Sequence, residues 1–219
     1  MLKTKIAVLI SGGGTNLQAI IDFAKSGGLK SGELALVVSD KAGAYGLTRA
    51  EKASIPTLVI AADKSLEITA RKAKFEAELQ SALEAAGIEM IVLAGFMRIL
   101  SADFVSKWEN RIINVHPSLI PSFCGEGFYG LHVHEAALAY GVKVTGATVH
   151  FVNEEPDGGP IVLQKAVDIR EDDTPETLQR RVMEQCEWSI LPRAVSLFCE
   201  GRLHVEGRHV KITEGAVWQ

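Results

Sequence analysis

The strongest constraint on the fold is an alternation of short apolar runs with longer helix-forming stretches. Five runs rich in Val, Ile and Leu occur in the first half of the chain, and nearly every position in them is hydrophobic. Such continuous hydrophobicity is typical of strands buried on both faces, as in a parallel sheet. The predicted strands are residues 5–10, 34–39, 56–60, 90–93 and 112–115.

Helix-forming segments separate these strands. The clearest covers residues 70–86, which are rich in Ala and Glu and are followed by Gly87. The other three are residues 17–25, 45–53 and 102–108. Alternating strands and helices form right-handed βαβ units, so the sequence predicts an α/β fold with a doubly wound, mostly parallel sheet.

The pattern changes after residue 130. A helix is expected over residues 133–139, followed by long strands over residues 144–152 and 161–167. The segment NEEPDGGP joins these strands, and its Pro and two Gly indicate a turn or loop. The two strands are therefore predicted to form an antiparallel pair at the edge of the sheet.

A long final helix is expected to begin after Thr174, an N-cap residue, with Pro175 at its first position. It would run to about residue 199 and be kinked or divided at Pro192, since proline disrupts a helix interior. The tail alternates around Gly207 like a small hairpin. No linker composition interrupts the chain, so we predict a single domain over residues 1–219.

Composition narrows the function classes. The 219 residues include 23 Lys and Arg against 27 Asp and Glu, a formal net charge of −4, which does not favour general nucleic-acid binding. No apolar run approaches the roughly 20 residues that span a bilayer. Three scattered cysteines, Cys124, Cys186 and Cys199, give no disulfide framework. A reduced, cytoplasmic location is expected.

The segment SGGGTNLQAI follows the first strand and opens the first helix. Unpaired amides at a helix N-terminus bind anions, and glycines let the backbone approach a phosphate. The dinucleotide fingerprint fails because Leu17 replaces its third glycine, and the Walker A pattern is missing. A dinucleotide remains conceivable because Asp40 ends the second strand, where a ribose-binding acid would sit. A phosphomonoester fits better.

The segment IINVHPSLIP places two polar side chains at the end of the fifth strand. Asn114 and His116 lie two residues apart and so point to one face, and Pro117 favours extended geometry at His116. A carboxamide and an imidazole side by side suit oxyanion stabilisation and proton transfer. Asp157, in PDGGP, reads as a turn residue when taken alone. A carboxylate close to His116 would raise the pKa of that histidine.

A metal site is not expected. His132 and His134 lie in LHVHE, but two histidines supply too few ligands for zinc, and no HExxH or CxxC accompanies them.

Four segments in register resemble the phosphoribosylglycinamide formyltransferase family. They are SGGGTNLQAI, LAGFMRILS, INVHPSLIPSF and GATVHFVNEEPDGGPIVLQ, and the resemblance runs from about residue 5 to about residue 205. It implies a Rossmann-like formyltransferase fold. It also implies transfer of a formyl group from 10-formyltetrahydrofolate to the amine of glycinamide ribonucleotide. The products are formylglycinamide ribonucleotide and tetrahydrofolate, in purine biosynthesis, without a metal.

The resemblance also assigns roles to residues. It implies that Asn114 is an oxyanion donor, that His116 is the acid and oxyanion stabiliser, and that Asp157 raises the pKa of His116. For the nucleotide and its phosphate it implies Gly14, Thr15, Asn16, Glu184 and Glu187. For folate it implies Lys72, Met97, Arg98, Ile99, Leu100, Asn114, Asn153, Glu154, Glu155, Pro156 and Asp157.

The match has two departures. Glu184 stands where family members carry Gln or Lys, so its contact with the nucleotide is an open question. Residues 122–131 are longer than the corresponding segment of the family's shorter members and are expected to reshape the edge of the site.

Two alternatives remain open. One is another 10-formyltetrahydrofolate enzyme, a hydrolase or a tRNA formyltransferase, although we expect neither the regulatory domain of the first nor the C-terminal domain of the second. The other is a nucleotide-binding oxidoreductase. The chain is expected to act on small molecules as a monomer or homodimer, with no nucleic acid or membrane as partner.

Overall fold

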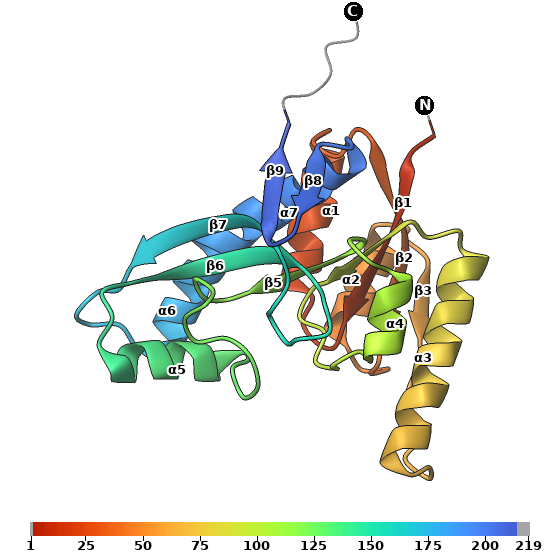
Figure 1. Ribbon diagram of the computed structural model, residues 1–219, viewed down its shortest axis with the longest axis horizontal. Coiled ribbons are helices and arrows are strands. Elements are labelled where there is room, and N and C mark those ends of the chain that lie inside the picture. Colours follow the sequence, from red (N-terminus) through yellow and green to blue (C-terminus); the bar gives the residue numbers. More distant parts are fainter. Residues whose placement is uncertain (1, 214–219) are drawn as a thin grey trace, which may run out of the picture. The chain divides into compact units, whose positions relative to one another are not determined.

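The computed structural model describes residues 2–213 and divides into two compact units, Met1–Ile112 and Ile113–Gln219 (Figure 1). The single domain predicted over residues 1–219 stays a prediction. Its residues 1 and 214–219 lie outside the described part of the chain.

The first unit is built from βα repeats, as predicted. Its elements are β1 (Thr4–Ile10), α1 (Thr15–Lys25), β2 (Gly32–Ser39), α2 (Tyr45–Lys52), β3 (Thr57–Val59), α3 (Ile68–Ala85), β4 (Met90–Leu93) and α4 (Ala102–Lys107). The strands lie in the order β3-β2-β1-β4, and all three neighbouring pairs are parallel.

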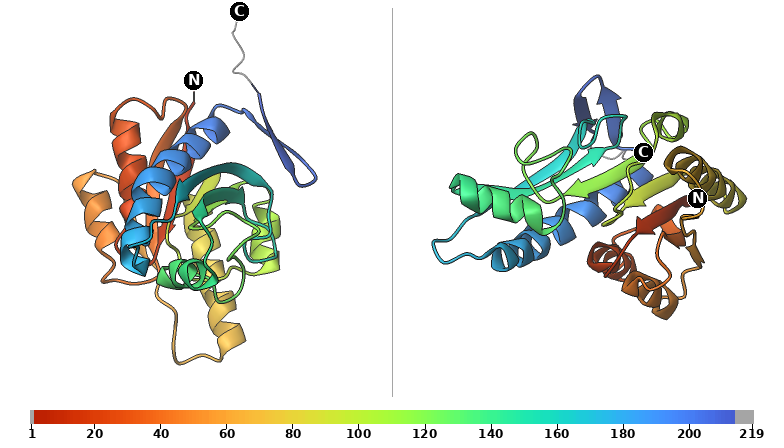
Figure 2. Two further views of the ribbon diagram at one scale, coloured as in Figure 1. Left: turned by 90° about the vertical axis from the view of Figure 1, so that its left-hand side faces the viewer. Right: turned by 90° about the horizontal axis from the view of Figure 1, so that it is seen from below.

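The sheet of this unit is covered on both faces. Figure 2 shows α1 and α2 on one side of the strands and α3 and α4 on the other. Consequently every residue from Ile6 to Ile10 is fully buried, which is the physical reason for the unbroken apolar run there. Leu17 and Ile20, three residues apart on α1, supply buried side chains on the facing stripe of the helix.

Two glycines allow the β1–α1 turn to pack closely on α2. Gly14 has a φ of +69°, and a Cβ on it would lie 2.6 Å from the Cα of Gly46. A Cβ on Gly46 would in turn overlap the Cδ1 atom of Ile10. The backbone N–H of Gly46 donates to the carbonyl of Gly12 at 3.0 Å. Close backbone contact between α2 and the turn therefore fixes the shape of the glycine loop.

The second unit is dominated by antiparallel pairing. Its elements are β5 (Ile112–His116), α5 (Leu131–Tyr140), β6 (Val144–Phe151), β7 (Ile161–Asp168), α6 (Pro175–Val182), the π-helix η1 (Met183–Glu187), α7 (Trp188–Cys199), β8 (Leu203–Glu206) and β9 (His209–Ile212). The strand order is β5-β6-β7-β9-β8. The β5–β6, β6–β7 and β8–β9 pairs are antiparallel, and β7 and β9 meet in parallel.

The predicted antiparallel pair and the tail hairpin are confirmed, with one difference in position. The hairpin of β8 and β9 continues the sheet beyond β7, so β7 is not the outermost strand. The α/β fold class with parallel and antiparallel strands is confirmed.

The long final helix begins as predicted but breaks elsewhere. Thr174 accepts a hydrogen bond from the N–H of Thr177 and forms a capping box, with Pro175 at the first helical position. The interruption falls at η1, before Pro192, which lies inside α7. A proline disturbs the turn that precedes it, because its nitrogen cannot donate and its ring meets the carbonyl four residues back. The predicted kink at Pro192 is therefore replaced by a wide turn upstream.

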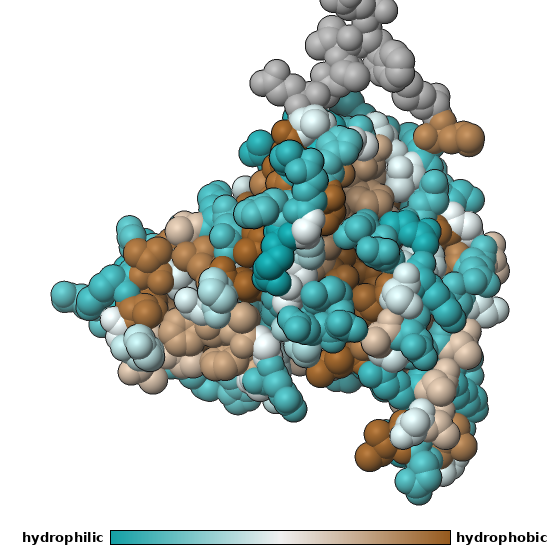
Figure 3. Space-filling view, in the orientation of Figure 1, coloured by the Kyte–Doolittle hydropathy of each residue, from teal (hydrophilic) through white to brown (hydrophobic). Residues whose placement is uncertain are grey.

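The surface is mixed in character. Figure 3 shows hydrophilic and hydrophobic areas alternating over the face it draws. Within residues 2–213, none of the helices combines the length and the apolar composition needed to cross a membrane.

The packing at Gly46 generates a stability prediction. Gly46→Ala should lower the free energy of unfolding by about 1–3 kcal/mol, because the added methyl group overlaps Ile10. Helix propensity alone would make alanine more stabilising than glycine at this position, so a lower free energy of unfolding shows the clash with Ile10. Urea denaturation measures it. Gly43→Ala, whose Cβ meets nothing within 4 Å, is the matched control and should change stability by less than about 0.5 kcal/mol. Equal effects of the two substitutions would contradict this account.

Candidate active site

Strand β5 presents two of the predicted catalytic residues on one face. Asn114 and His116 are alternate residues of β5 and pair with His150 and Thr148 of β6. The His116 side chain is only 5% exposed. The strand geometry expected from the Asn-Val-His-Pro pattern is therefore confirmed.

Asp157 reaches this face from the loop between β6 and β7. Its backbone has a φ of +55°, and the neighbouring Gly159 packs so tightly that a Cβ there would overlap the carbonyl of Phe151. One carboxylate oxygen, Oδ2, lies 3.3 Å from Nδ1 of His116, and the other, Oδ1, lies 3.5 Å from Nδ2 of Asn114. The structure thus brings together three residues that are distant in the sequence.

His150 of β6 completes the cluster. Its Nδ1 lies 2.8 Å from the carbonyl of Phe151, and because a carbonyl only accepts, Nδ1 carries a hydrogen. In neutral His150 the other ring nitrogen, Nε2, then accepts from Nδ2 of Asn114 at 3.2 Å. When protonated, Nε2 can instead donate to Oδ1 of Asp157, 3.5 Å away. His150 therefore orients the carboxamide of Asn114.

The charge state of His116 is set by opposing effects. Burial lowers the pKa of His116, while Asp157 and the carbonyl of Phe123 raise it, and burial prevails. The expected contribution of Asp157 is confirmed, and burial, which the sequence does not show, sets the net direction. Asp157 acts in the expected sense, but the pKa of His116 lies below its ordinary value in the ligand-free protein, because burial disfavours the imidazolium.

The carboxyl of Asp157 shows the reverse balance. Burial alone raises the pKa of Asp157, but contact with His150, the proximity of His116 and the N–H of Gly125 together lower it. The Gly125 N–H donates to Oδ2 at 2.9 Å. Asp157 is consequently a carboxylate at neutral pH.

The predicted phosphate loop lies in the first unit. Helix α1 begins at Thr15, directly after Gly14, and no side chain caps it. The first-turn amides of any helix have no acceptor within the helix itself, which is why such a turn suits an anion. Arg49 of α2 donates from Nε to the carbonyl of Gly13 at 2.8 Å and so supports the loop. The predicted Asn16 is buried in this turn.

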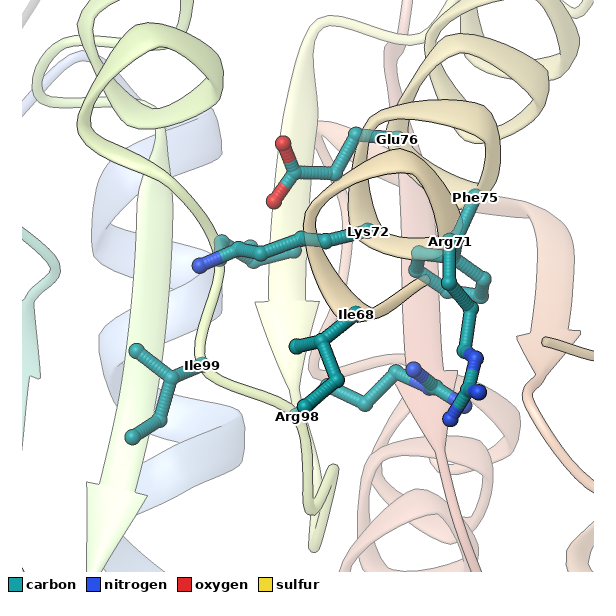
Figure 4. A pocket seen from close by; sticks show the side chains of 8 residues that line it. Ile68, Arg71, Lys72, Phe75, Glu76, Arg98 and Ile99 are labelled. Carbon is teal, nitrogen blue, oxygen red and sulfur yellow. The ribbon is translucent and has the colours of Figure 1, made fainter. Parts of the chain in front are cut away.

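A pocket of about 250 Å³ in the first unit contains several predicted folate residues (Figure 4). Lys72, Arg98, Ile99 and Leu100 line it with Ile68, Arg71, Phe75 and Glu76. The guanidinium of Arg98 lies 4.6 Å from the ring centre of Phe75, and its Nε lies 3.0 Å from Oδ2 of Asp40. Asp40 is thereby engaged by an arginine, which disfavours the ribose-binding role considered for it.

The remaining predicted binding residues differ in exposure. Met97 is exposed in the first unit. In the second unit, Glu154, Glu155 and Pro156 are exposed, and Asn153 accepts from the N–H of Glu155 at 3.2 Å. Both predicted nucleotide glutamates lie in η1, where Glu187 is buried and Glu184 is exposed. Their predicted contacts stay predictions.

Two features of the site escaped sequence reasoning. Backbone groups of Phe123 and Gly125 contact the side chains of His116 and Asp157, and no residue type marks a backbone contact in a sequence. His134 is fully buried, and burial lowers the pKa of His134 to about 4. By contrast, His132 is exposed and lies 2.9 Å from Glu135.

No group of three or more His, Cys, Asp or Glu that could hold a metal occurs in the described part of the chain.

Comparisons with known proteins show which family the chain belongs to. A sequence profile described as formyl transferase matches residues 4–195. Phosphoribosylglycinamide formyltransferase of Escherichia coli is 42% identical over 213 residues, which are 97% of this chain and 92% of that protein. Glycinamide ribonucleotide transformylase 1 from Symbiobacterium toebii has a crystal structure similar to this one. Its TM-score is 0.87 at 45% identity, covering 97% of this chain and 95% of that one.

A longer relative matches as well. The trifunctional purine biosynthetic protein adenosine-3 of Gallus gallus is 47% identical over 203 residues. These residues are 93% of this chain, whereas the match covers only 19% of that protein, so the chain spans about a fifth of its length. Because the family profile covers most of the sequence, and relatives of similar size match nearly end to end, the chain belongs to the formyl transferase family.

Proposed function

We propose that this protein is a phosphoribosylglycinamide formyltransferase of purine biosynthesis, acting in the cytoplasm. It transfers the formyl group of 10-formyltetrahydrofolate to the primary amine of glycinamide ribonucleotide and releases tetrahydrofolate. The observation that carries this proposal is the cluster of Asn114, His116 and Asp157, found in a chain closely similar to enzymes of that name.

The residue types of the cluster fit each step of the transfer. The amine attacks the formyl carbon, and negative charge develops on the formyl oxygen. The carboxamide of Asn114 donates a hydrogen bond to that oxygen, and the imidazolium of His116 stabilises it. The amine then loses a proton as the folate nitrogen departs and gains one. His116, held by Asp157, carries the proton to the departing nitrogen.

The lowered pKa of His116 suits this role. The proton affinity of His116, which burial lowers in the ligand-free site, rises when an oxyanion forms beside it, because nearby negative charge favours the charged form. Stabilisation is then greatest in the transition state, where it accelerates the reaction. Asp157 maintains part of that affinity beforehand.

Both ligand regions have suitable chemistry. The pocket of the first unit combines the cations Arg71, Lys72 and Arg98 with apolar side chains and with the carboxylate of Glu76, which accepts from Ser101. Three cations beside apolar side chains suit a ligand with an aromatic body and carboxylates, as a folate has. The turn at Gly14 and Thr15 suits the phosphate of the nucleotide. The predicted contacts of residues 97–100 and 153–157 with folate form part of this proposal, as does a monomeric or homodimeric state.

The first test separates transfer from hydrolysis. The protein should consume 10-formyltetrahydrofolate only when glycinamide ribonucleotide is present, and formylglycinamide ribonucleotide should appear in equal amount. Chromatography of both products measures this. Release of formate above the uncatalysed background without the nucleotide would instead favour a formyltetrahydrofolate hydrolase.

Removal of either donor should reduce turnover. Asn114→Ala and His116→Ala are each expected to lower kcat at least about 100-fold, the usual cost of losing one oxyanion donor. Circular dichroism should show an intact fold. His132→Ala, which removes an exposed histidine of α5, is the control and should retain wild-type turnover. Near wild-type rates in either site variant would refute the assignment.

The dependence of kcat on pH should show the effect of the Asp157 carboxylate. Asp157→Asn removes the charge that raises the pKa of His116, so protonated His116 is lost at lower pH than in wild type. The descending limb of kcat against pH should therefore move to lower pH, and the variant should be relatively weaker at pH 8 than at pH 6. An unchanged or upward-shifted limb would argue against this role of Asp157.

A further inference from the structure

One backbone segment contacts both His116 and Asp157. Residues 122–130, here called the site loop, follow β5 and precede α5. The carbonyl of Phe123 lies 2.8 Å from Nε2 of His116, and two residues later the N–H of Gly125 donates to Oδ2 of Asp157. The backbone at Phe123 and Gly125 therefore contacts both side chains of the cluster.

We propose that Phe123 is a positioning residue of the reaction: its ring, packed by Phe128 and Tyr140, fixes a backbone carbonyl that holds His116 in its working orientation. This inference rests on the proposed function and deepens it. It also gives the lengthened segment between β5 and α5 a defined role.

The backbone at Phe123 needs such an anchor. Its φ is +48°, a conformation that side chains other than glycine rarely adopt, and the surrounding structure must therefore enforce it. The ring of Phe123 meets Phe128 edge-on at 6.3 Å and Tyr140 edge-on at 6.0 Å between centroids. On its N-terminal side, the carbonyl of Ser122 accepts from the hydroxyl of Ser118 at 2.5 Å. Both sides of Phe123 are thus held.

The carbonyl determines which nitrogen of His116 carries a hydrogen. Since a carbonyl oxygen only accepts, Nε2 is the donor to Phe123. Nδ1 then faces the carboxylate of Asp157 at 3.3 Å, a contact that is favourable when Nδ1 is also protonated. Both nitrogens consequently meet acceptors. This geometry favours the imidazolium and so opposes the effect of burial, which disfavours it.

Other titratable groups near the cluster do not supply this effect. His150 of β6 lowers the pKa of His116, and His134 of α5 lies close enough to feel its charge. Cys124, in the site loop, has a thiol whose pKa is raised by burial and by Asp157, so it is neutral. Asp157 and the carbonyl of Phe123 are therefore the groups that favour protonated His116.

Loss of the ring should release both contacts. Without it the strained backbone can relax to a negative φ, which redirects the carbonyl of Phe123 and shifts the N–H of Gly125. His116 would keep its place in β5 but lose an acceptor. A merely structural role for Phe123 would change stability and leave the titration of His116 unaltered.

The test is a titration of His116 by imidazole nitrogen NMR in the ligand-free protein, with the signal assigned by its loss in His116→Asn. Phe123→Ala should lower the pKa of His116 by at least about 0.5. It should also reduce kcat roughly tenfold, with both KM values changed less than about twofold. Phe123→Tyr, which keeps the ring, should restore both properties.

Two further variants keep the proposal falsifiable. Tyr129→Ala removes an exposed aromatic ring of the site loop that contacts His132, and it should leave the titration and kcat unchanged. Tyr140→Ala removes one partner of the Phe123 ring at a side chain that is 80% exposed. It should shift the titration in the same direction as Phe123→Ala, and it replaces that variant if Phe123→Ala does not fold.

The outcomes are distinct. An unchanged His116 titration in Phe123→Ala, or in Tyr140→Ala where it stands in, overturns the proposal, as does an equal shift in Tyr129→Ala. Failure of the wild-type protein to transfer formyl groups to glycinamide ribonucleotide would refute the proposed function instead. The titration would still decide whether Phe123 positions His116.

Discussion

The site depends on one largely buried carboxylate held between two donors on a strand. Asp157 lies at a positive-φ turn between β6 and β7, and its side chain is only 13% exposed. A carboxylate so placed is costly unless it is paired and hydrogen-bonded. Asp157 contacts His116, Asn114 and the N–H of Gly125, so the proposed chemistry and the local fold rest on the same contacts.

The same burial sets the proton affinity of His116. A solvent-exposed imidazole beside a carboxylate would gain proton affinity, but His116 is nearly enclosed, and the cost of burying a charge outweighs the attraction of Asp157. In the proposed reaction, a negative oxygen formed next to the imidazole offsets this cost of burying its charge. Preorganised groups of this kind lower a barrier because they need little rearrangement during the reaction.

Much of this arrangement was predictable from the sequence, for physical reasons specific to its segments. Strands buried on both faces must be apolar throughout, so Ile6 to Ile10 and its counterparts marked the parallel sheet. The two-residue period of a strand placed Asn114 and His116 together, and Pro117 kept that end extended. Thr174 and Pro175 predicted the start of the last helix, because helix capping is local and needs no tertiary contact.

The features that the sequence did not predict depend on tertiary structure or on contacts of backbone groups. The approach of Asp157 to His116 follows from the pairing of β6 with β5 and β7, which sequence patterns could not place. The net pKa of His116 depends on burial, a property of the folded chain. The contact from Phe123 is made by its backbone carbonyl, a group that every residue has, so the residue type does not indicate it. The break at η1 depends on how the turn before Pro192 adjusts to the proline.

We propose that Asn114 and Asp157 act in formyl transfer as one connected cluster. A double-mutant cycle with Asn114→Ala and Asp157→Asn, measured as kcat/KM for formyl transfer to glycinamide ribonucleotide, tests it most directly. The losses should be strongly non-additive, with a coupling of at least about 1 kcal/mol, because each substitution disrupts the contacts of the other residue. Additive losses would show that the two residues work independently and that no such cluster acts in the reaction.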